Sequence, residues 1–234
     1  MNFNKVNKRL VVLTGAGMSA ESGLRTFREM GGLWEEYDVY EVASPGGWAK
    51  DRALVLRFYN ERRKQLLETT PNRGHLGLVD LEKNFDVQII TQNIDDLHER
   101  AGSTNILHLH GELRKSQSTA DSDMVYDIDG WELNEGDLCE KGSQLRPHVV
   151  WFGEAVPAIE EAAEIVSTAH VFIIIGTSMN VYPAAGLINH VPETVPIYII
   201  DPSEVTVPGY SRIKVIRKKA GEGIEELIRE LKDE

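Results

Sequence analysis

Four short apolar runs, rich in β-branched residues and separated by helical patterns, constrain the fold of this chain more than any other feature. The runs are residues 10–13, 87–90, 171–175 and 197–200, with weaker candidates at 106–109 and 213–216. An uninterrupted apolar run of this length is typical of a parallel strand that is buried on both faces. The helical patterns cover residues 51–68, 160–169 and 223–232. Strands that alternate with helices predict an α/β fold built on a parallel sheet.

Two stretches interrupt this alternation, and we expect them to meet as a small second lobe. Residues 30–73 are rich in Gly, Trp and Tyr and contain one clear helix, whereas residues 114–146 are polar and show no strong period. Trp48 and Trp131 supply apolar anchors, one in each stretch. The expected division is a large domain of residues 1–35, 74–113 and 147–234, and a small lobe of residues 36–73 and 114–146.

Charge and length narrow the classes of function. The 234 residues include 25 Lys and Arg against 37 Asp and Glu, a formal net charge of −12. Phosphate backbones and anionic lipids repel such a protein, so we expect neither nucleic acid nor a membrane surface as a partner. Residues 1–10 are polar, unlike a signal peptide, and no apolar run reaches membrane-spanning length. We therefore expect a cytoplasmic protein and take a monomer as the default state.

The first predicted strand runs into a glycine-rich turn at residues 14–20. Its G-x-G-x-x-A pattern, from Gly15 to Ala20, lies after a strand and before a helix-like segment. Glycines allow the backbone to approach a pyrophosphate, whose charge amides at a helix start can meet. By itself the turn fits a purely structural role equally well. A dehydrogenase would place a second strand and an acidic residue about 20 residues further on, and no strand follows here, which disfavours hydride transfer.

Polar side chains also gather where the next two strands end. Gln92, Asn93 and Asp95 follow one strand, and His108 and His110 follow the other. Strand alternation would put both histidines on one face if the strand continues that far. A histidine beside amides and carboxylates is a candidate general base. The alternatives are an Asx turn in which Asp95 caps a helix, and a core histidine that donates to a carbonyl.

Two more strand ends carry small or acidic residues. Gly176-Thr177-Ser178 follows the most apolar run, and a helix is expected to open near Pro183. Asp201 closes the next run and could hold ribose hydroxyls, although Asp-Pro is also a common turn. In open α/β sheets, ligands bind at the carboxyl ends of the strands. The sequence therefore predicts one site along this edge of a Rossmann-like sheet.

Six motifs in this order resemble the signature series of the sirtuins, which are NAD-dependent protein lysine deacylases. They are T-G-A-G-M-S-A at 14–20, T-F-R at 26–28, Q-N-I-D at 92–95, H-G at 110–111, V-W-F-G-E at 150–154 and G-T-S at 176–178. The resemblance extends from residue 10 to about residue 225. It implies an enzyme that uses NAD and acylated protein lysines in extended peptide segments. The implied products are nicotinamide, 2′-O-acyl-ADP-ribose and free lysine.

The resemblance also assigns roles to individual residues. It implies that His110 is the general base, acting on the ribose hydroxyls, with Asn93 as a second catalytic residue. Backbone groups of Val150, Trp151, Phe152 and Gly153 would bind the peptide by strand addition. The implied cofactor-binding residues are Gly15, Ala16, Gly17, Ser19, Ala20, Phe27, Arg28, Gln92, Asn93, Ile94, Asp95, Gly176, Thr177, Ser178, Asp201 and Ala220.

The acyl specificity is predicted from three residues. Tyr59 and Arg62 stand three apart in a helical pattern and so share one face, and Ala43 lies upstream. This set resembles the class III sirtuin branch, which removes malonyl, succinyl and glutaryl groups. Arginine can bind a terminal carboxylate bidentately, tyrosine adds a hydroxyl, and alanine leaves room. We expect acidic acyl groups to be favoured alongside acetyl. The alternative is that Tyr59 packs in the core while Arg62 is one more solvated charge.

The chain departs from the family where most sirtuins carry two cysteine pairs that bind a structural zinc. The corresponding interval offers only Ser116, Ser118 and the single cysteine, Cys139. One thiol can form neither an intramolecular disulfide nor a multi-thiolate metal site. We therefore expect no metal, a structural role for Cys139, and a lobe held together by packing. The expected apolar anchors are Val125, Tyr126, Ile128, Trp131 and Leu133.

Two other classes of function keep the same ligand. An ADP-ribosyltransferase or NAD glycohydrolase would use the same cofactor chemistry with a different acceptor. A non-catalytic NAD or ADP-ribose sensor would only bind, but it has no need of a base such as His110 beside Asn93 and Asp95. Formation of O-acyl-ADP-ribose requires deacylation, so the reaction products distinguish these classes.

Overall fold

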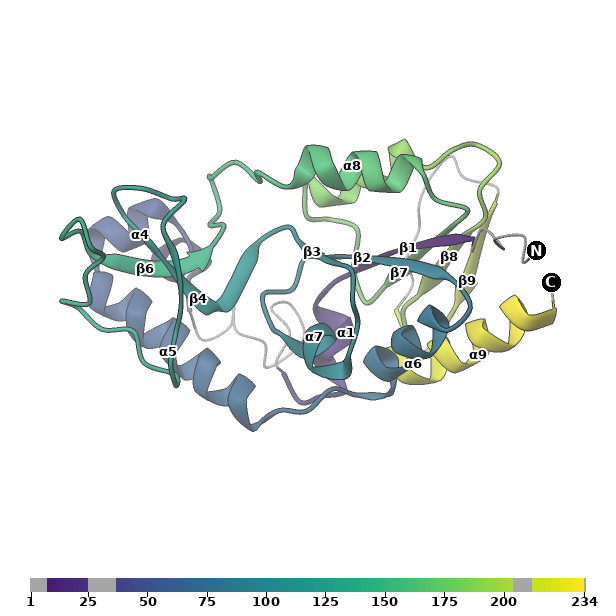
Figure 1. Ribbon diagram of the computed structural model, residues 1–234, viewed down its shortest axis with the longest axis horizontal. Helices are drawn as coiled ribbons and strands as arrows, with labels where there is room; N and C mark the ends of the chain where they lie inside the picture. The colour runs from purple at the N-terminus through teal and green to yellow at the C-terminus, as the bar shows by residue number, and fades with distance from the viewer. Residues whose placement is uncertain (1–7, 25–36, 204–211, 234) are drawn as a thin grey trace, which may run out of the picture.

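The parallel sheet forms the centre of the large part of the molecule. A computed structural model describes residues 8–24, 37–203 and 212–233 (Figure 1). Six strands lie in the order β3-β2-β1-β7-β8-β9, and all neighbours are parallel. The strands are β1 (Arg9–Thr14), β2 (Asp86–Thr91), β3 (Ile106–His108), β7 (Val171–Ile175), β8 (Ile197–Ile200) and β9 (Ile213–Ile216). The predicted α/β class with a Rossmann-like parallel sheet is confirmed.

Helices cover both faces of this sheet, which explains why its strands are continuous apolar runs. Within β1, Leu10 and Val12 pack on one side of the sheet, and Val11 and Leu13 pack on the other. In Figure 1, α6 and α9 lie along one face and α8 and the 3₁₀ helix η1 along the opposite face. These helices are α6 (Arg73–Glu82), α8 (Ile159–Ser167), η1 (Ala184–His190) and α9 (Ala220–Asp233).

The direction of the strand order reverses between β1 and β7. The chain moves from β1 outward to β2 and β3, and then returns to place β7 on the free side of β1. The turns after these two central strands therefore lie side by side, and they are joined by backbone hydrogen bonds. Gly15 N donates to Ile175 O at 3.0 Å, and Gly17 N donates to Gly176 O at 2.9 Å. Such a switch point is where open α/β sheets form a ligand crevice.

A second, three-stranded antiparallel sheet lies apart from the first, at the left of Figure 1. Its strands are β4 (Gly111–Ser118), β5 (Val125–Asp127) and β6 (Leu145–Val149). Near it lie the helices α3 (Val39–Val42), α4 (Pro45–Lys50) and α5 (Arg52–Glu68), while α1 (Ala16–Ala20) and α7 (Leu97–Ala101) belong to the sheet edge described above. Residues 114–146 showed no strong period because inward positions of β4 hold Ser116 and Ser118, each 1% exposed, instead of large apolar side chains.

The apolar contacts of this small sheet differ in part from the expected ones. Ile128 and Leu133 are buried and cluster with Leu56 of α5, as predicted for apolar anchors. Val125, in contrast, is 38% exposed and anchors nothing, so that prediction was wrong. Trp131 is partly buried, and Lys64 lies 5.3 Å from its ring centroid. The packing is therefore concentrated at the α5 end of the sheet.

A buried cation on α5 also ties the helix to the small sheet. The Arg63 side chain is fully buried, and it donates to the carbonyls of Leu113 at 2.7 Å and Trp131 at 2.6 Å. Burial lowers the pKa of Arg63 to about 10, so the guanidinium remains charged at neutral pH. Asn60, one turn earlier, accepts from Leu133 N at 3.0 Å and donates to Leu133 O at 3.1 Å. Hydrogen bonds to a buried charged group are among the stronger ones in proteins.

In the described ranges, every helix is too short or too polar to span a lipid bilayer.

Candidate active site

A cavity of about 770 Å³ opens where the switch point of the parallel sheet faces the small sheet. Its walls come from the turns after β1, β2 and β7, from α5, and from the segment after β6. A volume of this size lies within the range of small-molecule and cofactor sites, about 300–1,000 Å³. Segments that are far apart in the sequence thus form one site.

Nearly all predicted site residues that the structure describes line this cavity. They are Gly15, Ala16, Gly17, Ser19, Ala20, Ala43, Tyr59, Arg62, Gln92, Asn93, Ile94, Asp95, His110, Val150, Trp151, Phe152, Gly153, Gly176, Thr177, Ser178 and Asp201. Ala220 is not among the lining residues; it packs in the core at the start of α9, where the neighbouring Lys219 lines the cavity instead. Phe27 and Arg28 lie outside the described residues.

Other lining residues carried no signal in the sequence. Leu24, Leu113 and Lys219 belong to segments without a recognisable motif, and only the topology brings them to the cavity. Tyr182 is a further lining residue, next to Pro183, where a helix was expected to open, whereas Glu154 already belonged to the V-W-F-G-E motif. A local pattern cannot reveal such residues because their role depends on contacts between distant segments.

The two glycine turns pack too tightly for side chains. A Cβ atom on Gly15 would lie 2.7 Å from Thr177 Cβ, and one on Gly17 would lie 2.7 Å from Gly176 Cα. Gly176 itself has a φ of +62°, in the left-handed region that favours glycine. The cavity wall here is therefore bare backbone. Glycine is thus required for the contact between the two turns, and since the Gly15 and Gly17 amides already donate to Ile175 O and Gly176 O, a pyrophosphate would have to meet other amides of this turn.

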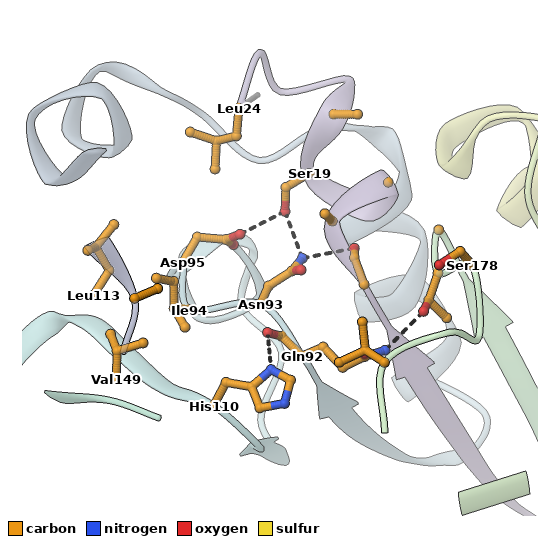
Figure 2. Close-up of a pocket in the computed structure, with 18 of the residues that line it drawn as sticks. Ser19, Leu24, Gln92, Asn93, Ile94, Asp95, His110, Leu113, Val149 and Ser178 are labelled. Atoms are coloured by element: carbon orange, nitrogen blue, oxygen red, sulfur yellow. Dashed lines mark hydrogen bonds between the residues drawn. The ribbon is translucent and has the colours of Figure 1, made fainter. Parts of the chain in front are cut away.

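A buried hydrogen-bond network lies next to these turns (Figure 2). Asn93 Nδ2 donates to Gly15 O at 3.0 Å and to Ser19 Oγ at 3.1 Å. Ser19 Oγ in turn donates to Asp95 Oδ2 at 2.9 Å. Burial raises the pKa of Asp95, while the Ser19 hydroxyl and the Leu97 N–H oppose that shift by hydrogen bonding to the carboxylate. The network holds an amide and a carboxylate in fixed positions on the cavity wall.

His110 is oriented by the same loop. Its Nδ1 lies 3.0 Å from Gln92 O (Figure 2). Because a carbonyl can only accept, Nδ1 carries the proton of the neutral ring, and Nε2 has a lone pair available. Burial lowers the pKa of His110, so the ring is neutral at physiological pH. Gln92 also spans the switch point, since its Nε2 donates to Thr177 Oγ1 at 3.1 Å.

His108 and His110 would share one face only if their strand continued to His110, and it does not. Strand β3 ends at His108, and only His110 lines the cavity. His108 Nδ1 lies 3.1 Å from Asn93 O, and its Nε2 lies 2.7 Å from a carboxylate oxygen of Glu99. Burial opposes protonation, but the Glu99 carboxylate outweighs it and raises the pKa of His108. His108 thus supports the Asn93 loop from behind and is not a candidate base.

The other end of the cavity is lined by Ala43, Tyr59 and Arg62. Tyr59 is 3% exposed, and burial raises the pKa of its hydroxyl to about 12. The guanidinium carbon of Arg62 lies 5.7 Å from the Phe58 ring centroid. Tyr59 and Arg62 therefore both line the cavity, and Tyr59 also belongs to a buried apolar cluster with Phe58.

The segment proposed for peptide binding is already partly paired within the chain. Val150 N donates to His110 O at 2.9 Å, and Phe152 N donates to Ala43 O at 3.0 Å. Trp151 N donates to a Glu154 carboxylate oxygen at 2.8 Å. Peptide recognition along residues 150–153 therefore has to use groups other than these three amides.

The cysteine region holds a hydrogen-bonded cluster. The buried Cys139 Sγ lies 3.3 Å from Ser118 Oγ, and Ser118 Oγ also accepts from Ala120 N at 3.1 Å. In the part of the chain that the structure describes, no group of three or more His, Cys, Asp or Glu side chains could hold a metal ion.

These features define a nucleotide-dependent α/β enzyme, in which a neutral imidazole and a buried amide–carboxylate pair face the cavity beside two glycine turns. Comparison with known proteins identifies the family. Residues 15–183 match the model of the Sir2 family, and the chain belongs to that family.

The curated relatives cover nearly the whole chain. A protein of Bacteroides thetaiotaomicron named NAD-dependent protein deacylase is 57% identical over 225 residues, which are 94% of this chain and 96% of the relative. A protein of the same name from Helicobacter pylori strain 26695 is 53% identical over 226 residues, which are 96% of this chain and 97% of the relative.

Solved structures of the family have the same fold. A Sir2 homologue in complex with NAD is 40% identical, with a TM-score of 0.87, and the match covers 97% of this chain and 90% of that one. A Sir2 enzyme solved with a deacetylated peptide and 3′-O-acetyl ADP-ribose is 27% identical, with a TM-score of 0.80, and the match covers 96% and 94% of the two chains.

Proposed function

We propose that this chain, a Sir2-family enzyme that uses NAD, removes acyl groups from protein lysines and favours acyl chains that end in a carboxylate. One observation carries the proposal. Ala43, Tyr59 and Arg62 line the same cavity as His110 and the glycine turns. A substrate in this cavity can therefore meet the proposed base and the proposed acyl pocket at the same time.

The glycine turns and the Asn93 network fit NAD. Gly15, Ala16 and Gly17, which line the cavity, would lie along the diphosphate. Asn93 and Asp95 offer an amide and a carboxylate suited to the nicotinamide ribose and carboxamide. The remaining residues proposed for NAD are Ser19, Ala20, Phe27, Arg28, Gln92, Ile94, Gly176, Thr177, Ser178, Asp201 and Ala220. When bound, NAD supplies a ribose carbon that accepts the acyl oxygen as nicotinamide departs.

His110 is the proposed general base. The Gln92 carbonyl holds its Nδ1 proton, so that Nε2 can take a proton from a ribose hydroxyl. Neutrality is required for this step, and burial of the ring maintains it. Asn93 is proposed to assist by holding the ribose in reach of His110.

The acyl pocket favours a carboxylate for electrostatic reasons. Arg62 can donate two parallel hydrogen bonds to a terminal carboxylate, and Tyr59 can donate a third. Ala43 is small and leaves space for the extended acyl chain. We propose on these grounds that the chain belongs to the class III branch of the family, which the resemblance of the three residues also favours.

Three further points of the proposal concern the whole molecule. The parallel sheet and its helices are proposed to form one domain, from residues 1–35, 74–113 and 147–234, and the remaining residues to form a small lobe without zinc. The peptide is proposed to bind in extended form at residues 150–153. A monomer in the cytoplasm is the proposed state.

The test is a panel of acetyl-, malonyl- and succinyl-lysine peptides with NAD, read by mass spectrometry as nicotinamide and O-acyl-ADP-ribose. We expect kcat/KM to be higher for succinyl-lysine than for acetyl-lysine. Arg62→Met should lower the succinyl value by about 10- to 100-fold, because charge-assisted hydrogen bonds are lost, and should leave the acetyl value nearly unchanged. Equal values for the two acyl groups, unaltered by Arg62→Met, would contradict the acyl pocket.

A variant that lacks the proposed base, together with the reaction products, tests whether the enzyme is a deacylase. His110→Ala should lower deacylation by about 10²–10⁴-fold and retain NAD binding. If nicotinamide appears together with free ADP-ribose or ADP-ribosylated protein, and without O-acyl-ADP-ribose, the enzyme is a glycohydrolase or an ADP-ribosyltransferase instead.

A further inference from the structure

The side chain of Trp151 makes a polar contact inside the proposed acyl pocket. Trp151 is only 2% exposed, and its Nε1 lies 3.1 Å from the Tyr59 hydroxyl oxygen. The family resemblance assigned backbone groups of Trp151 to peptide binding and gave its indole no role. The contact joins the segment after β6 to helix α5, across the cavity wall.

This contact fixes the direction of the Tyr59 hydroxyl proton. An indole N–H can only donate, so the Tyr59 oxygen accepts from Trp151, and its own proton has to point elsewhere. Among the described residues, no side chain or carbonyl accepts that proton. Burial keeps the hydroxyl protonated, since it raises the pKa of Tyr59 to about 12. The cavity therefore receives an O–H donor from Tyr59.

Arg146 and Glu154 hold the indole in place. The guanidinium carbon of Arg146 lies 3.3 Å from the Trp151 ring centroid, a stacked arrangement. Arg146 also donates to both carboxylate oxygens of Glu154, at 2.7 and 3.0 Å, and Glu154 accepts from Trp151 N at 2.8 Å. On another side the Trp48 ring centroid lies 5.7 Å away. A ring fixed by so many contacts can direct a neighbouring hydroxyl without losing much freedom on substrate binding.

We propose that Trp151 is a specificity-determining positioning residue, whose indole N–H turns the Tyr59 hydroxyl into a donor aimed at the distal end of the acyl chain. An acyl group that ends in a carboxylate accepts this proton, whereas an acetyl group leaves the donor without a partner. The inference rests on the acidic-acyl pocket proposed above. It goes further by assigning selectivity to a residue that does not itself touch the carboxylate.

The test uses Trp151→Phe, which keeps an aromatic ring on Arg146 and removes the N–H donor together with one ring of the indole. The matched control is Trp48→Phe, the same change in a ring that packs against Trp151. For the full-length protein and both variants, kcat and KM are measured with succinyl- and acetyl-lysine peptides of identical sequence, and peptide affinity is measured by calorimetry. We expect Trp151→Phe to raise the KM and the Kd for the succinyl peptide by about tenfold, the loss of one hydrogen bond. The acetyl values should change by a smaller factor, so that the succinyl-to-acetyl ratio falls in Trp151→Phe, whereas Trp48→Phe should keep the wild-type ratio.

A double-mutant cycle separates positioning from packing. If Trp151 acts through Tyr59, then Trp151→Phe adds little to the loss already caused by Tyr59→Phe. An unchanged succinyl-to-acetyl ratio in Trp151→Phe, an equal loss with both peptides, or strictly additive losses would each overturn the inference while leaving the acidic-acyl pocket standing. A wild-type protein without succinyl preference would instead contradict the proposed function and, with it, the inference.

Discussion

At the scale of single residues, the state of each reactive side chain depends on one or two neighbours. The Gln92 carbonyl selects the tautomer of His110, and the Ser19 hydroxyl stabilises the Asp95 carboxylate against the effect of burial. His108 differs from His110 because a carboxylate, Glu99, reaches its second ring nitrogen. Two histidines of the same short segment therefore have pKa values shifted in opposite directions.

The pKa of His110 predicts the acid limb of the pH profile. Protonation of Nε2 would remove the proposed base, and burial lowers the pKa of His110 below the ordinary value of 6.5. We expect kcat/KM to fall only below pH 6.5 as the solution is made more acid. Protonation of Asp95, whose pKa is raised, could also lower kcat/KM in acid, because Asp95 is proposed to bind NAD. Measuring NAD affinity over the same pH range is therefore the control. A midpoint at or above 6.5, with NAD affinity constant, would contradict the assignment.

At the scale of elements, the start of α6 combines capping with a buried titratable ring. Asn72 caps the helix, and His75 completes the capping box by accepting from Asn72 N at 3.2 Å. His75 is fully buried, with its ring 4.9 Å from that of His98. Burial lowers the pKa of His75 to about 4 and that of His98 well below its ordinary value. Both rings are therefore neutral in the folded protein.

This pair predicts a loss of stability in acid. Between the unfolded pKa of 6.5 and the folded pKa of about 4, the unfolded state binds more protons than the folded state at His75. The free energy of unfolding therefore decreases as the pH is lowered through that window, by up to about 3 kcal/mol from this residue. His75→Gln retains an acceptor for the capping box and does not titrate. Urea unfolding at pH 7 and pH 5 should show that the free energy of unfolding decreases less in His75→Gln than in the wild type. An equal decrease in the two proteins would contradict the prediction.

The sequence predicted the strands of the parallel sheet because burial on both faces leaves an uninterrupted apolar run. It did not predict α6, which contains two glycines. A Cβ on Gly77 would lie 2.5 Å from Ile224 of α9, so the close packing of two helices requires a residue with poor helix propensity. Strand β4 was missed because the small polar residues Ser116 and Ser118 occupy inward positions. Strand β6 was missed because its five residues, LRPHV, include an arginine, a proline and a histidine and form no apolar run.

The candidate site was predictable where it follows strand ends and much less so elsewhere. The residues after β1, β2 and β7 meet at the switch point because parallel strands share one carboxyl edge. The contact of Trp151 with Tyr59 joins segments about 90 residues apart, and no local pattern indicates it. Lys219 lines the cavity for the same reason, as a consequence of topology alone.

At the scale of the whole molecule, the cavity needs both sheets. The turns of the parallel sheet supply Gly15 and Asn93, whereas α5 supplies Tyr59 and Arg62. Helix α5 is joined to the small sheet by Arg63 and by the cluster around Leu133. We therefore expect the packing of the small sheet to influence the shape of the proposed acyl pocket.

Metal removal tests how that sheet is held together. We expect a strong chelator to leave both the Tm and deacylation unchanged, because buried apolar contacts and the hydrogen bonds of Arg63 hold the sheet. Leu133→Ala is the positive control: it should lower the free energy of unfolding by about 2–4 kcal/mol, since it leaves a cavity beside Ile128. Stoichiometric zinc in the purified protein, or a lower Tm after chelation, would contradict the expectation.

The pairing of β1 with β7 has a consequence for the nascent chain. Leu10 pairs with Val87 on one side and with Val171 on the other. As the chain leaves the ribosome, β1 can join β2 early, but its opposite edge stays open until most of the polypeptide has been synthesised. Throughout that interval an apolar strand edge is exposed to other nascent chains, which is the condition that molecular chaperones relieve.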